Sequence, residues 1–349
     1  MPQRVVIIGG DAGGMAAASQ IHRLRPDTEV IALERGHWTS YSACGIPFLV
    51  GGLVEGGVER LVSRSPEQHR ANGIDVRLRH EATSLDLAAR RVEVRDVEDG
   101  STYSLGFDQV LLGMGGRPMR PPLPGIDLPF VRGVQTLDDG ATLMAEAEEM
   151  GCRRVVVVGG GYIGLEMAEA FLHRGCTSTV IDVAPHPLAG LEPELGALVV
   201  AALEKEGVDL LAGTKVEGFE PGVVHTTRGD LPADLVILGI GVQPNSELAA
   251  EAGITLGARD AVGVDDRQQT SAEGVWAAGD CAETTHLVTG KKVYIALGTY
   301  ANRHARVAGI NIGGGDARSP KVLGTAVTKL CSTEIGLTGL NSRQAAEPG

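Results

Sequence analysis

The chain has 349 residues, a formal net charge of −13 and 43% hydrophobic residues, enough apolar material for two or three domains of about 150 residues each. The acidic balance and the absence of any basic cluster argue against nucleic-acid binding. No run of about 18 apolar residues occurs, so we expect no membrane span.

Five cysteines lack the spacing of a disulfide framework, which fits a reducing compartment. The sequence enters an apolar strand, Arg4–Ile8, without a recognisable leader, and we therefore expect a cytoplasmic protein. The nine histidines show no metal-ligand spacing, so we expect no metal site.

One design occurs twice: an apolar strand, a glycine-rich turn, a helix and a second strand that ends on an acid. The first copy begins with Arg4–Ile8, has a helix expected over residues 15–24 and ends at Glu34. The second begins with Arg154–Val158, has a helix expected over residues 165–174 and ends at Asp182. Such a unit binds a dinucleotide, because the glycines admit the pyrophosphate to the helix N-terminus and the acid accepts ribose hydroxyls. The sequence thus predicts an α/β protein with two Rossmann-like domains.

The second copy carries the full fingerprint, with Gly159, Gly161 and Gly164 before its acid. The first copy departs from it, because Asp11 stands where the second glycine is expected, and glycine-rich turns also occur for purely structural reasons. Two dinucleotide folds in one chain suggest FAD paired with a nicotinamide cofactor. No Arg or Lys follows Asp182 to hold a 2′-phosphate, so NADH is favoured over NADPH.

The domain order follows from two strands that each lead into a loop, Gln109–Leu112 and Leu235–Leu238, and from a proline-rich linker at residues 117–125. These exits suggest that the second dinucleotide fold is inserted in the first. We predict an FAD-binding domain over residues 1–115 and 243–320, an NAD(P)H-binding domain over residues 116–242, and a separate final segment at residues 321–349.

Four motifs resemble those of the flavoprotein pyridine nucleotide-disulfide oxidoreductases, whose fold is glutathione-reductase-like. They are GGDAGG at residues 9–14, the strand exit at residues 107–118, GGGYIGLE at residues 159–166, and residues 270–280, which end in Gly279-Asp280. The resemblance implies FAD contacts at Gly9, Ala12, Gly13, Gly14, Glu34, Arg35, Gly115, Asp280, Leu297, Gly298 and Thr299. It implies NADH contacts at Gly159, Gly161, Tyr162, Ile163, Gly164, Glu166, Asp182 and Gly241, although packing and solvation explain Tyr162 and Glu166 nearly as well.

A single cysteine, Cys44, narrows the resemblance to the branch of coenzyme A (CoA)-disulfide reductases, CoA-persulfide or sulfur reductases, NADH oxidases and NADH peroxidases. The next cysteine is Cys152, which excludes a local dithiol. Pro47 favours a helix that begins near Ile46, which would place the sulfur of Cys44 at the helix N-terminus. The resemblance implies that Cys44 is the redox residue and that CoA is its thiol partner, through a Cys-S-S-CoA intermediate.

The resemblance also implies substrate contacts at Gln20, Arg23, Ser40 and Asn302. Oxidases and peroxidases of the branch usually carry a histidine where this chain has Ala12, which favours a reductase. Two alternatives stay open: an NADH oxidase or peroxidase with a Cys44 sulfenic acid, and a catalytically incomplete, flavin-binding redox sensor. Cys152, Cys176, Cys281 and Cys331 are interpreted as small buried hydrophobes.

The last segment, residues 321–349, resembles the start of the family's dimerisation domain, most of which this sequence lacks. In CoA-disulfide reductases the partner's copy of that domain supplies tyrosines to the active site. We expect a homodimer where the full domain is present.

Overall fold

The computed structural model describes residues 3–149, 151 and 153–347, so the interpretation of Cys152 lies outside the described residues. The chain folds into two compact units. The first comprises Met1–Ser42, Leu61–Arg117 and Gln243–Val322, and the second comprises Ala43–Arg60, Pro118–Val242 and Leu323–Gly349. The assignment of a cofactor to each predicted domain is a separate matter and stays a prediction.

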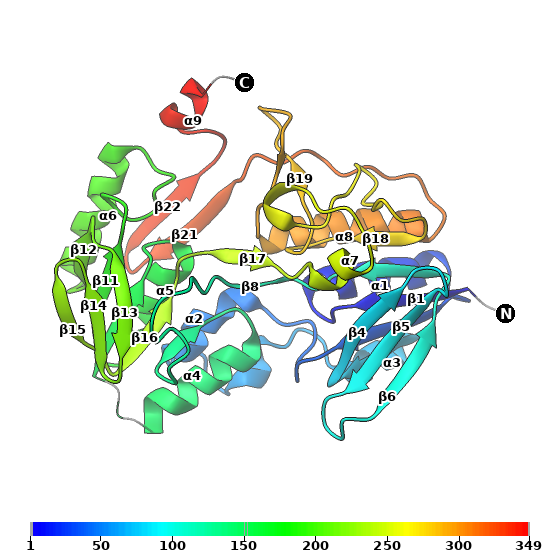
Figure 1. The fold of residues 1–349 in the computed structure, drawn as a ribbon, viewed down its shortest axis with the longest axis horizontal. Coiled ribbons are helices and arrows are strands. Elements are labelled where there is room, and N and C mark those ends of the chain that lie inside the picture. The colour runs from blue at the N-terminus through cyan, green and yellow to red at the C-terminus, as the bar shows by residue number, and fades with distance from the viewer. Residues whose placement is uncertain (1–2, 150, 152, 348–349) are drawn as a thin grey trace. The chain divides into compact units, whose positions relative to one another are not determined.

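A parallel sheet forms the centre of the first unit, in the order β3-β2-β1-β7-β18. Figure 1 labels its strands β1 and β18. Its strands are β1 (Arg4–Ile8), β2 (Glu29–Glu34), β3 (Ile74–Leu78), β7 (Gln109–Leu112) and β18 (Val275–Ala277). Strands β1, β2, β7 and β18 are mostly apolar because both faces of the sheet are covered, whereas the edge strand β3 alternates apolar with charged residues.

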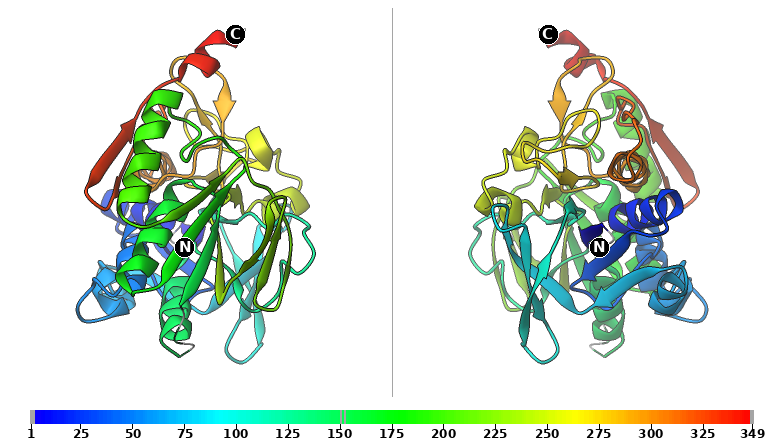
Figure 2. Two further views of the ribbon diagram at one scale, coloured as in Figure 1. Left: turned by 90° about the vertical axis from the view of Figure 1, so that its left-hand side faces the viewer. Right: turned by 90° about the vertical axis from the view of Figure 1, so that its right-hand side faces the viewer.

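Two helices, α1 (Ala12–Leu24) and α8 (Gly298–Ile312), cover one face of this sheet and lie side by side (Figure 2, right). The antiparallel strands β4 (His80–Asp86), β5 (Arg91–Asp96) and β6 (Thr102–Gly106) cover the other face. Successive residues of β1 serve the two cores in turn: Ile7 packs against the helices and Ile8 against the β4–β6 side.

Shorter elements complete the first unit. They are α3 (Pro66–Ala71), α7 (Glu247–Glu251), β19 (Thr284–Thr285) and β20 (Lys292–Val293). Two further strands, β8 (Gly116–Pro118) and β17 (Val242–Pro244), lie where the chain passes from one unit to the other and back.

The second unit repeats the design around a parallel sheet in the order β12-β11-β10-β16-β9. Its strands are β9 (Val131–Gly133), β10 (Arg154–Val158), β11 (Thr177–Asp182), β12 (Asp209–Ala212) and β16 (Leu235–Leu238). An antiparallel sheet of β13 (Val216–Glu220), β14 (Val223–Thr226) and β15 (Gly229–Pro232) shares a core with it.

The helices of the second unit are α2 (Ile46–Val50), α4 (Leu137–Glu149), α5 (Tyr162–His173), α6 (Pro193–Lys205) and α9 (Ser342–Ala346). The hairpin of β21 (Ala326–Leu330) and β22 (Thr333–Leu337) is fastened to α5, because the Thr328 hydroxyl donates to Glu166 Oε1 at 2.6 Å. The backbone N–H of Cys331 likewise donates to Glu169 Oε2 at 2.9 Å. In the described part of the chain, no helix is long and apolar enough to cross a membrane.

Both dinucleotide helices begin three residues earlier than the sequence predicted, at Ala12 and at Tyr162. Glycine is a poor helix former, so a glycine run reads as a turn that precedes the helix. Here Gly13, Gly14 and Gly164 lie inside the first turn, where they are buried.

Candidate dinucleotide and thiol sites

The first glycine-rich turn leaves no room for side chains at Gly9 and Gly14, where the neighbouring atoms belong to the backbone. A Cβ added to Gly14 would lie 1.8 Å from the carbonyl oxygen of Gly9, and one added to Gly9 would lie 2.1 Å from that of Gly113. Gly9 also has φ +112°, a conformation that other residues rarely adopt. The turn therefore keeps the backbone close to β1 and β7 and leaves its outer side open to a ligand.

Glu34 ties this turn to the end of β2. Its Oε2 accepts the N–H of Gly10 at 2.7 Å and its Oε1 accepts the N–H of Gly36 at 2.7 Å. Arg35, the next residue, is exposed. The second turn repeats the device, because Asp182 accepts the N–H of Gly160 at 2.6 Å and that of Ala184 at 2.8 Å.

Two half-buried acids, Asp11 and Asp280, lie in the first unit near the glycine turn. Burial raises the pKa of Asp11 to about 6. The N–H of Tyr41, which donates to Asp11 Oδ1 at 3.1 Å, opposes this rise. Burial also raises the pKa of Asp280 to about 6, and the Oδ1 of Asp280 has no hydrogen-bond partner among the described residues. A buried acceptor without a donor fits the hydroxyl groups of a dinucleotide.

The N-terminus of α8 supplies donors in the same unit. Leu297 caps the helix without a side-chain hydrogen bond, and Gly298 and Thr299 are both exposed in its first turn. The free N–H groups of a helix of this length carry a partial positive charge that stabilises anions. Gly115, with φ +65° and no atom within 4 Å of an added Cβ, leaves the backbone accessible at the end of β7.

These observations fit FAD, with a cradle at Gly9–Gly14, acids at Glu34 and Asp280, and donors at Leu297–Thr299. Ala12 begins α1 and Gly13 is buried beside the carbonyl of Ala278. The structure brings all these residues into one unit.

The second glycine-rich turn is built like the first. A Cβ added to Gly164 would lie 2.0 Å from the carbonyl oxygen of Gly159, and Gly161 caps α5. Tyr162 and Ile163 are half-buried in the first turn of α5, and the Tyr162 hydroxyl has no partner among the described residues. Gly241 is exposed, with φ +109°.

Glu166, predicted as a nicotinamide contact, also has a partner within its own unit, and its contact with the nicotinamide stays a prediction. Its Oε1 accepts the hydrogen bond of Thr328, and burial raises the pKa of its carboxyl group. The carboxylate is thus engaged by the β21–β22 hairpin within its own unit.

Cys44 is exposed and lies in a short 3₁₀ turn, Ala43–Gly45, immediately before α2. Helix α2 begins at Ile46 with Pro47 in its first turn, as the sequence predicted. The other described cysteines differ from it: Cys176 and Cys281 are buried, and Cys331 is half-buried. Burial raises the pKa of Cys281 to about 11 and that of Cys331 to about 12, which keeps both as thiols.

The predicted substrate residues are distributed over α1, α8 and the loop after β2. Gln20 is buried, with its Cβ facing Gly309 of α8, whereas Arg23 is exposed. Asn302 is exposed and donates to the carbonyl of Gly298 at 3.0 Å. The Ser40 hydroxyl lies 2.8 Å from Nε2 of His69, a residue that the sequence did not single out. All four belong to the first unit, whereas Cys44 belongs to the second.

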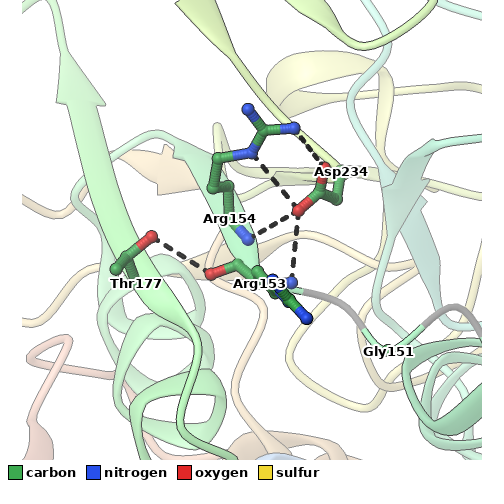
Figure 3. A pocket seen from close by; sticks show the side chains of 5 residues that line it. All are labelled: Gly151, Arg153, Arg154, Thr177 and Asp234. Atoms are coloured by element: carbon green, nitrogen blue, oxygen red, sulfur yellow. Dashed lines mark hydrogen bonds and ion pairs between the residues drawn. The ribbon is translucent and has the colours of Figure 1, made fainter.

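A surface hollow lies elsewhere, in the second unit (Figure 3). It has a volume of about 720 Å³ and is lined by Gly151, Arg153, Arg154, Thr177 and Asp234. Arg154 and Thr177 begin β10 and β11, so the hollow lies at the N-terminal ends of these strands, whereas the glycine turn lies at the C-terminal end of β10. Arg154 Nη2 donates to Asp234 Oδ1 at 2.6 Å, which satisfies the main charges there.

Sequence reasoning missed Asp11 as an acid with a raised pKa and His69 as the partner of Ser40. Asp11 gave a signal, because it replaced an expected glycine. His69 gave none.

The profile of the pyridine nucleotide-disulphide oxidoreductase family matches residues 3–305. The chain belongs to this family. The predicted family, the fold class of Rossmann-like parallel-sheet domains and the assignment as an FAD-dependent oxidoreductase are thereby confirmed.

Relatives within the pyridine nucleotide-disulphide oxidoreductases carry two kinds of name. An NAD(P)H coenzyme A polysulfide/persulfide reductase of Pyrococcus horikoshii is 39% identical over 100% of this chain and 78% of its own length. An NADH oxidase of Methanocaldococcus jannaschii is 36% identical over 98% of this chain and 77% of its own length.

Two solved structures have nearly the same fold as this chain. Reduced CoADR-RHD of Bacillus anthracis has a TM-score of 0.95 at 31% identity, over 98% of this chain and 62% of that one. An NAD-dependent persulfide reductase of A. fulgidus has a TM-score of 0.95 at 35% identity, over 99% of this chain and 65% of that one. The chain thus spans less than two thirds of these two proteins.

Proposed function

We propose that this oxidoreductase reduces a CoA persulfide, polysulfide or disulfide with electrons from NAD(P)H, through the thiol of Cys44. The observation that carries the proposal is the similarity, at 38–39% identity over 99–100% of the chain, to CoA-dependent sulfur and persulfide reductases of Pyrococcus. The exposed position of Cys44 ahead of α2 supports it, because a redox thiol must be accessible to an external disulfide.

The sulfur chemistry balances with one cysteine. The Cys44 thiolate attacks the inner sulfur of CoA-S-SH, forms a Cys44-S-S-CoA bond and releases HS⁻. Two electrons and one proton then cleave that bond to the Cys44 thiolate and free CoA-SH. FAD, when bound, supplies this two-electron reduction from the nicotinamide hydride.

The residues of the chain would bind and orient the reactants. Gly9, Gly14 and the α8 N-terminus would hold the FAD phosphates, while Glu34 and Asp280 would accept its hydroxyl groups. Gly159, Gly164 and Asp182 would hold NADH in the same way. We assign Gln20, Arg23, Ser40 and Asn302 to the CoA side.

The test measures NADH-driven sulfide release from CoA persulfide by the purified flavoprotein. We expect Cys44→Ser to abolish sulfide release while the flavin is still reduced by NADH. Cys176→Ala, which changes a buried thiol, is the matched control and should retain turnover. The intact mass of the native protein should also show one CoA that a reductant removes. Flavin reduction by NADH without any thiol or sulfide release would instead support the redox-sensor alternative and contradict the proposal.

NADH oxidase activity is the second candidate, because the NADH oxidase of M. jannaschii is nearly as similar. Ala12, which is not a histidine, argues against it. Oxygen consumption that exceeds sulfide release, and that survives removal of CoA, would favour the oxidase.

Cytoplasmic location and homodimer formation stay predictions from the sequence. Light scattering on the purified protein measures the second of them.

A further inference from the structure

The loop that follows β2 is held in an unusual backbone conformation. Ser40 has φ +49°, which a residue with a side chain rarely adopts. The carbonyl of Gly10 accepts both the hydroxyl of Thr39 and, at 3.3 Å, the N–H of Ser40. The carbonyl of Ser40 accepts the N–H of Ser63 at 2.8 Å. Backbone strain that several contacts maintain is typical of residues at functional sites.

The Ser40 hydroxyl meets a buried imidazole. His69 lies in α3, is 1% exposed and has its Nε2 2.8 Å from the Ser40 oxygen. A reciprocal capping box of Ser65 and Gln68 begins α3, and the N–H of His69 donates to the carbonyl of Ser65 at 3.1 Å. The imidazole is therefore fixed by its helix as well as by burial.

The other ring nitrogen identifies the tautomer. Nδ1 of His69 is buried and has no partner among the described residues. A proton on Nδ1 would be a buried donor without an acceptor, which folded proteins rarely tolerate. A proton on Nε2 is satisfied by the Ser40 oxygen and leaves only an unpaired acceptor at Nδ1.

The ring is also uncharged near neutral pH. Burial, with a contribution from Arg64, lowers the pKa of His69 to about 4. A neutral ring with its proton on Nε2 donates to Ser40, so the hydroxyl of Ser40 keeps its own proton for another acceptor. The Ser40 side chain is half-buried and has no second partner among the described residues.

We propose that His69 is a positioning residue for substrate recognition: its Nε2–H fixes the Ser40 hydroxyl so that this hydroxyl donates a hydrogen bond to an acceptor oxygen of the CoA substrate. The inference rests on the proposed function, because it takes Ser40 as a substrate contact. His69 does not touch substrate and acts only through Ser40.

The experiment compares KM and kcat for CoA persulfide, normalised to bound flavin, in the full chain. We expect Ser40→Ala and His69→Phe each to raise KM about three- to tenfold, the effect of one lost or misdirected hydrogen bond, with a smaller effect on kcat. The double variant should match Ser40→Ala alone, because the imidazole works through the hydroxyl. His69→Gln, which retains an N–H near the Nε2 position, should restore most of the affinity. Glu67→Gln, on the exposed side of α3, is the matched control.

A second measurement does not need turnover or a variant. In ¹⁵N-histidine NMR spectra of the wild-type protein, His69 should show the Nε2–H tautomer and no titration between about pH 5 and about pH 8. A proton on Nδ1, additive KM effects of Ser40→Ala and His69→Phe, or an unchanged KM in His69→Phe would each overturn the inference. If the wild-type protein itself releases no sulfide from CoA persulfide, the proposed function fails first and the substrate role of His69 fails with it. If the wild type turns over normally but the variants do not alter KM, this inference alone fails.

Discussion

At the scale of single residues, Gly14 is the position where the fold and the dinucleotide site constrain each other most. A Cβ there would lie 1.8 Å from the Gly9 carbonyl, which is backbone and cannot rotate away. We predict that Gly14→Ala lowers the free energy of unfolding by about 1–3 kcal/mol or more, because α1 must move away from β1. The same movement should lower the flavin content. Thermal melting and the flavin-to-protein absorbance ratio measure both effects.

Gly13→Ala is the control for that prediction. A Cβ at Gly13 would lie 3.5 Å from the Ala278 carbonyl, an ordinary van der Waals contact. We therefore expect Gly13→Ala to melt close to the wild type. A Gly14→Ala protein that melts like Gly13→Ala and binds as much flavin would show that the turn adjusts freely.

A second prediction concerns Val183 and the choice between NADH and NADPH. It follows Asp182 and is 72% exposed, so a longer side chain fits without repacking. We predict that Val183→Arg raises the NADPH-to-NADH ratio of kcat/KM for flavin reduction by about tenfold, because guanidinium pairs with a 2′-phosphate. Val183→Gln has similar length without charge and should leave the ratio unchanged. An equal shift in both variants would refute the electrostatic explanation.

These positions also show what the sequence can and cannot reveal at this scale. Gly14, Glu34 and Asp182 were predicted because a strand, a glycine turn and an acid recur at fixed spacing. The contact between Ser40 and His69 joins residues 29 apart through a strained loop, and no local pattern encodes it. The engagement of Glu166 by Thr328, across 162 residues, is hidden for the same reason.

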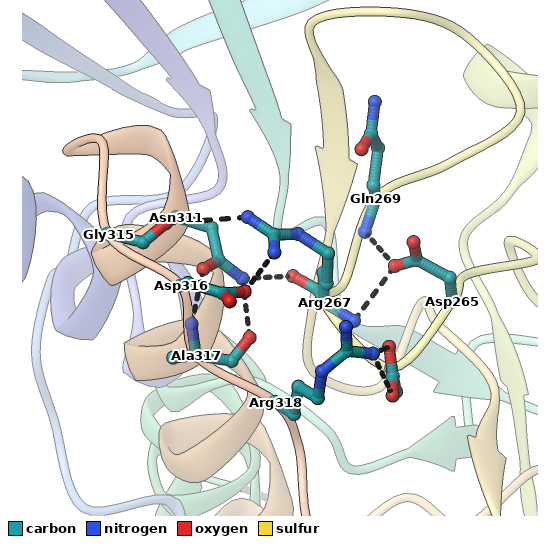
Figure 4. A network of polar contacts seen from close by, with 9 residues as sticks. Asp265, Arg267, Gln269, Asn311, Gly315, Asp316, Ala317 and Arg318 are labelled. Atoms are coloured by element: carbon teal, nitrogen blue, oxygen red, sulfur yellow. Dashed lines mark hydrogen bonds and ion pairs between the residues drawn. The ribbon is translucent and has the colours of Figure 1, made fainter.

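At the scale of elements, the C-terminal end of α8 is held by a polar network in the first unit (Figure 4). Asn311, 6% exposed, donates to the carbonyls of Arg267 and Ala317 at 2.9 Å each and accepts the Ala317 N–H at 2.7 Å. Arg318 and Asp266 form an exposed ion pair at 2.6 Å in the same network. A buried side chain that satisfies three backbone groups stabilises far more than an exposed pair.

We accordingly predict that Asn311→Ala lowers the stability of the protein by about 2–3 kcal/mol, because backbone groups lose buried partners. Arg318→Ala should change it by about 1 kcal/mol or less. Urea denaturation of both variants gives the comparison. Equal losses would mean that water replaces the amide of Asn311 without cost.

The sequence predicted where helices and strands lie along the chain better than it predicted which of them pack together. Strands β1, β7, β10 and β16 have the predicted bounds, because buried parallel strands are short apolar runs. Helix α2 was also predicted, but its packing was not. A Cβ on Gly51 would lie 3.2 Å from Ala170 of α5, and one on Gly140 of α4 would lie 2.7 Å from Ile46. Such close approaches depend on tertiary geometry, and glycine in a sequence indicates a turn as readily as a contact.

At the scale of the whole molecule, two buried histidines and two half-buried aspartates have opposite effects on how stability depends on pH. Burial lowers the pKa of His69 and of His304 to about 4, and raises that of Asp11 and of Asp280 to about 6. The unfolded values are 6.5 for the histidines and 3.8 for the aspartates. Each histidine therefore stabilises the fold above pH 6.5, and this contribution is lost as the pH falls towards about 4. Each aspartate stabilises the fold below 3.8 and loses that contribution as the pH rises through about 6.

Near pH 5 the histidines and the aspartates have cancelling effects on the slope of stability against pH. Unfolding protonates the two histidines and releases protons from the two aspartates. Removing one group breaks the balance. His69→Phe leaves one net proton released on unfolding, so its stability relative to the wild type should fall as the pH rises from about 4 to about 6. Asp11→Asn leaves one net proton taken up, so its relative stability should rise over the same interval. Urea denaturation at several pH values measures these slopes, with Glu204→Gln, an exposed position on α6, as the control. Parallel curves for all four proteins would mean that the four groups titrate alike in the folded and unfolded chains.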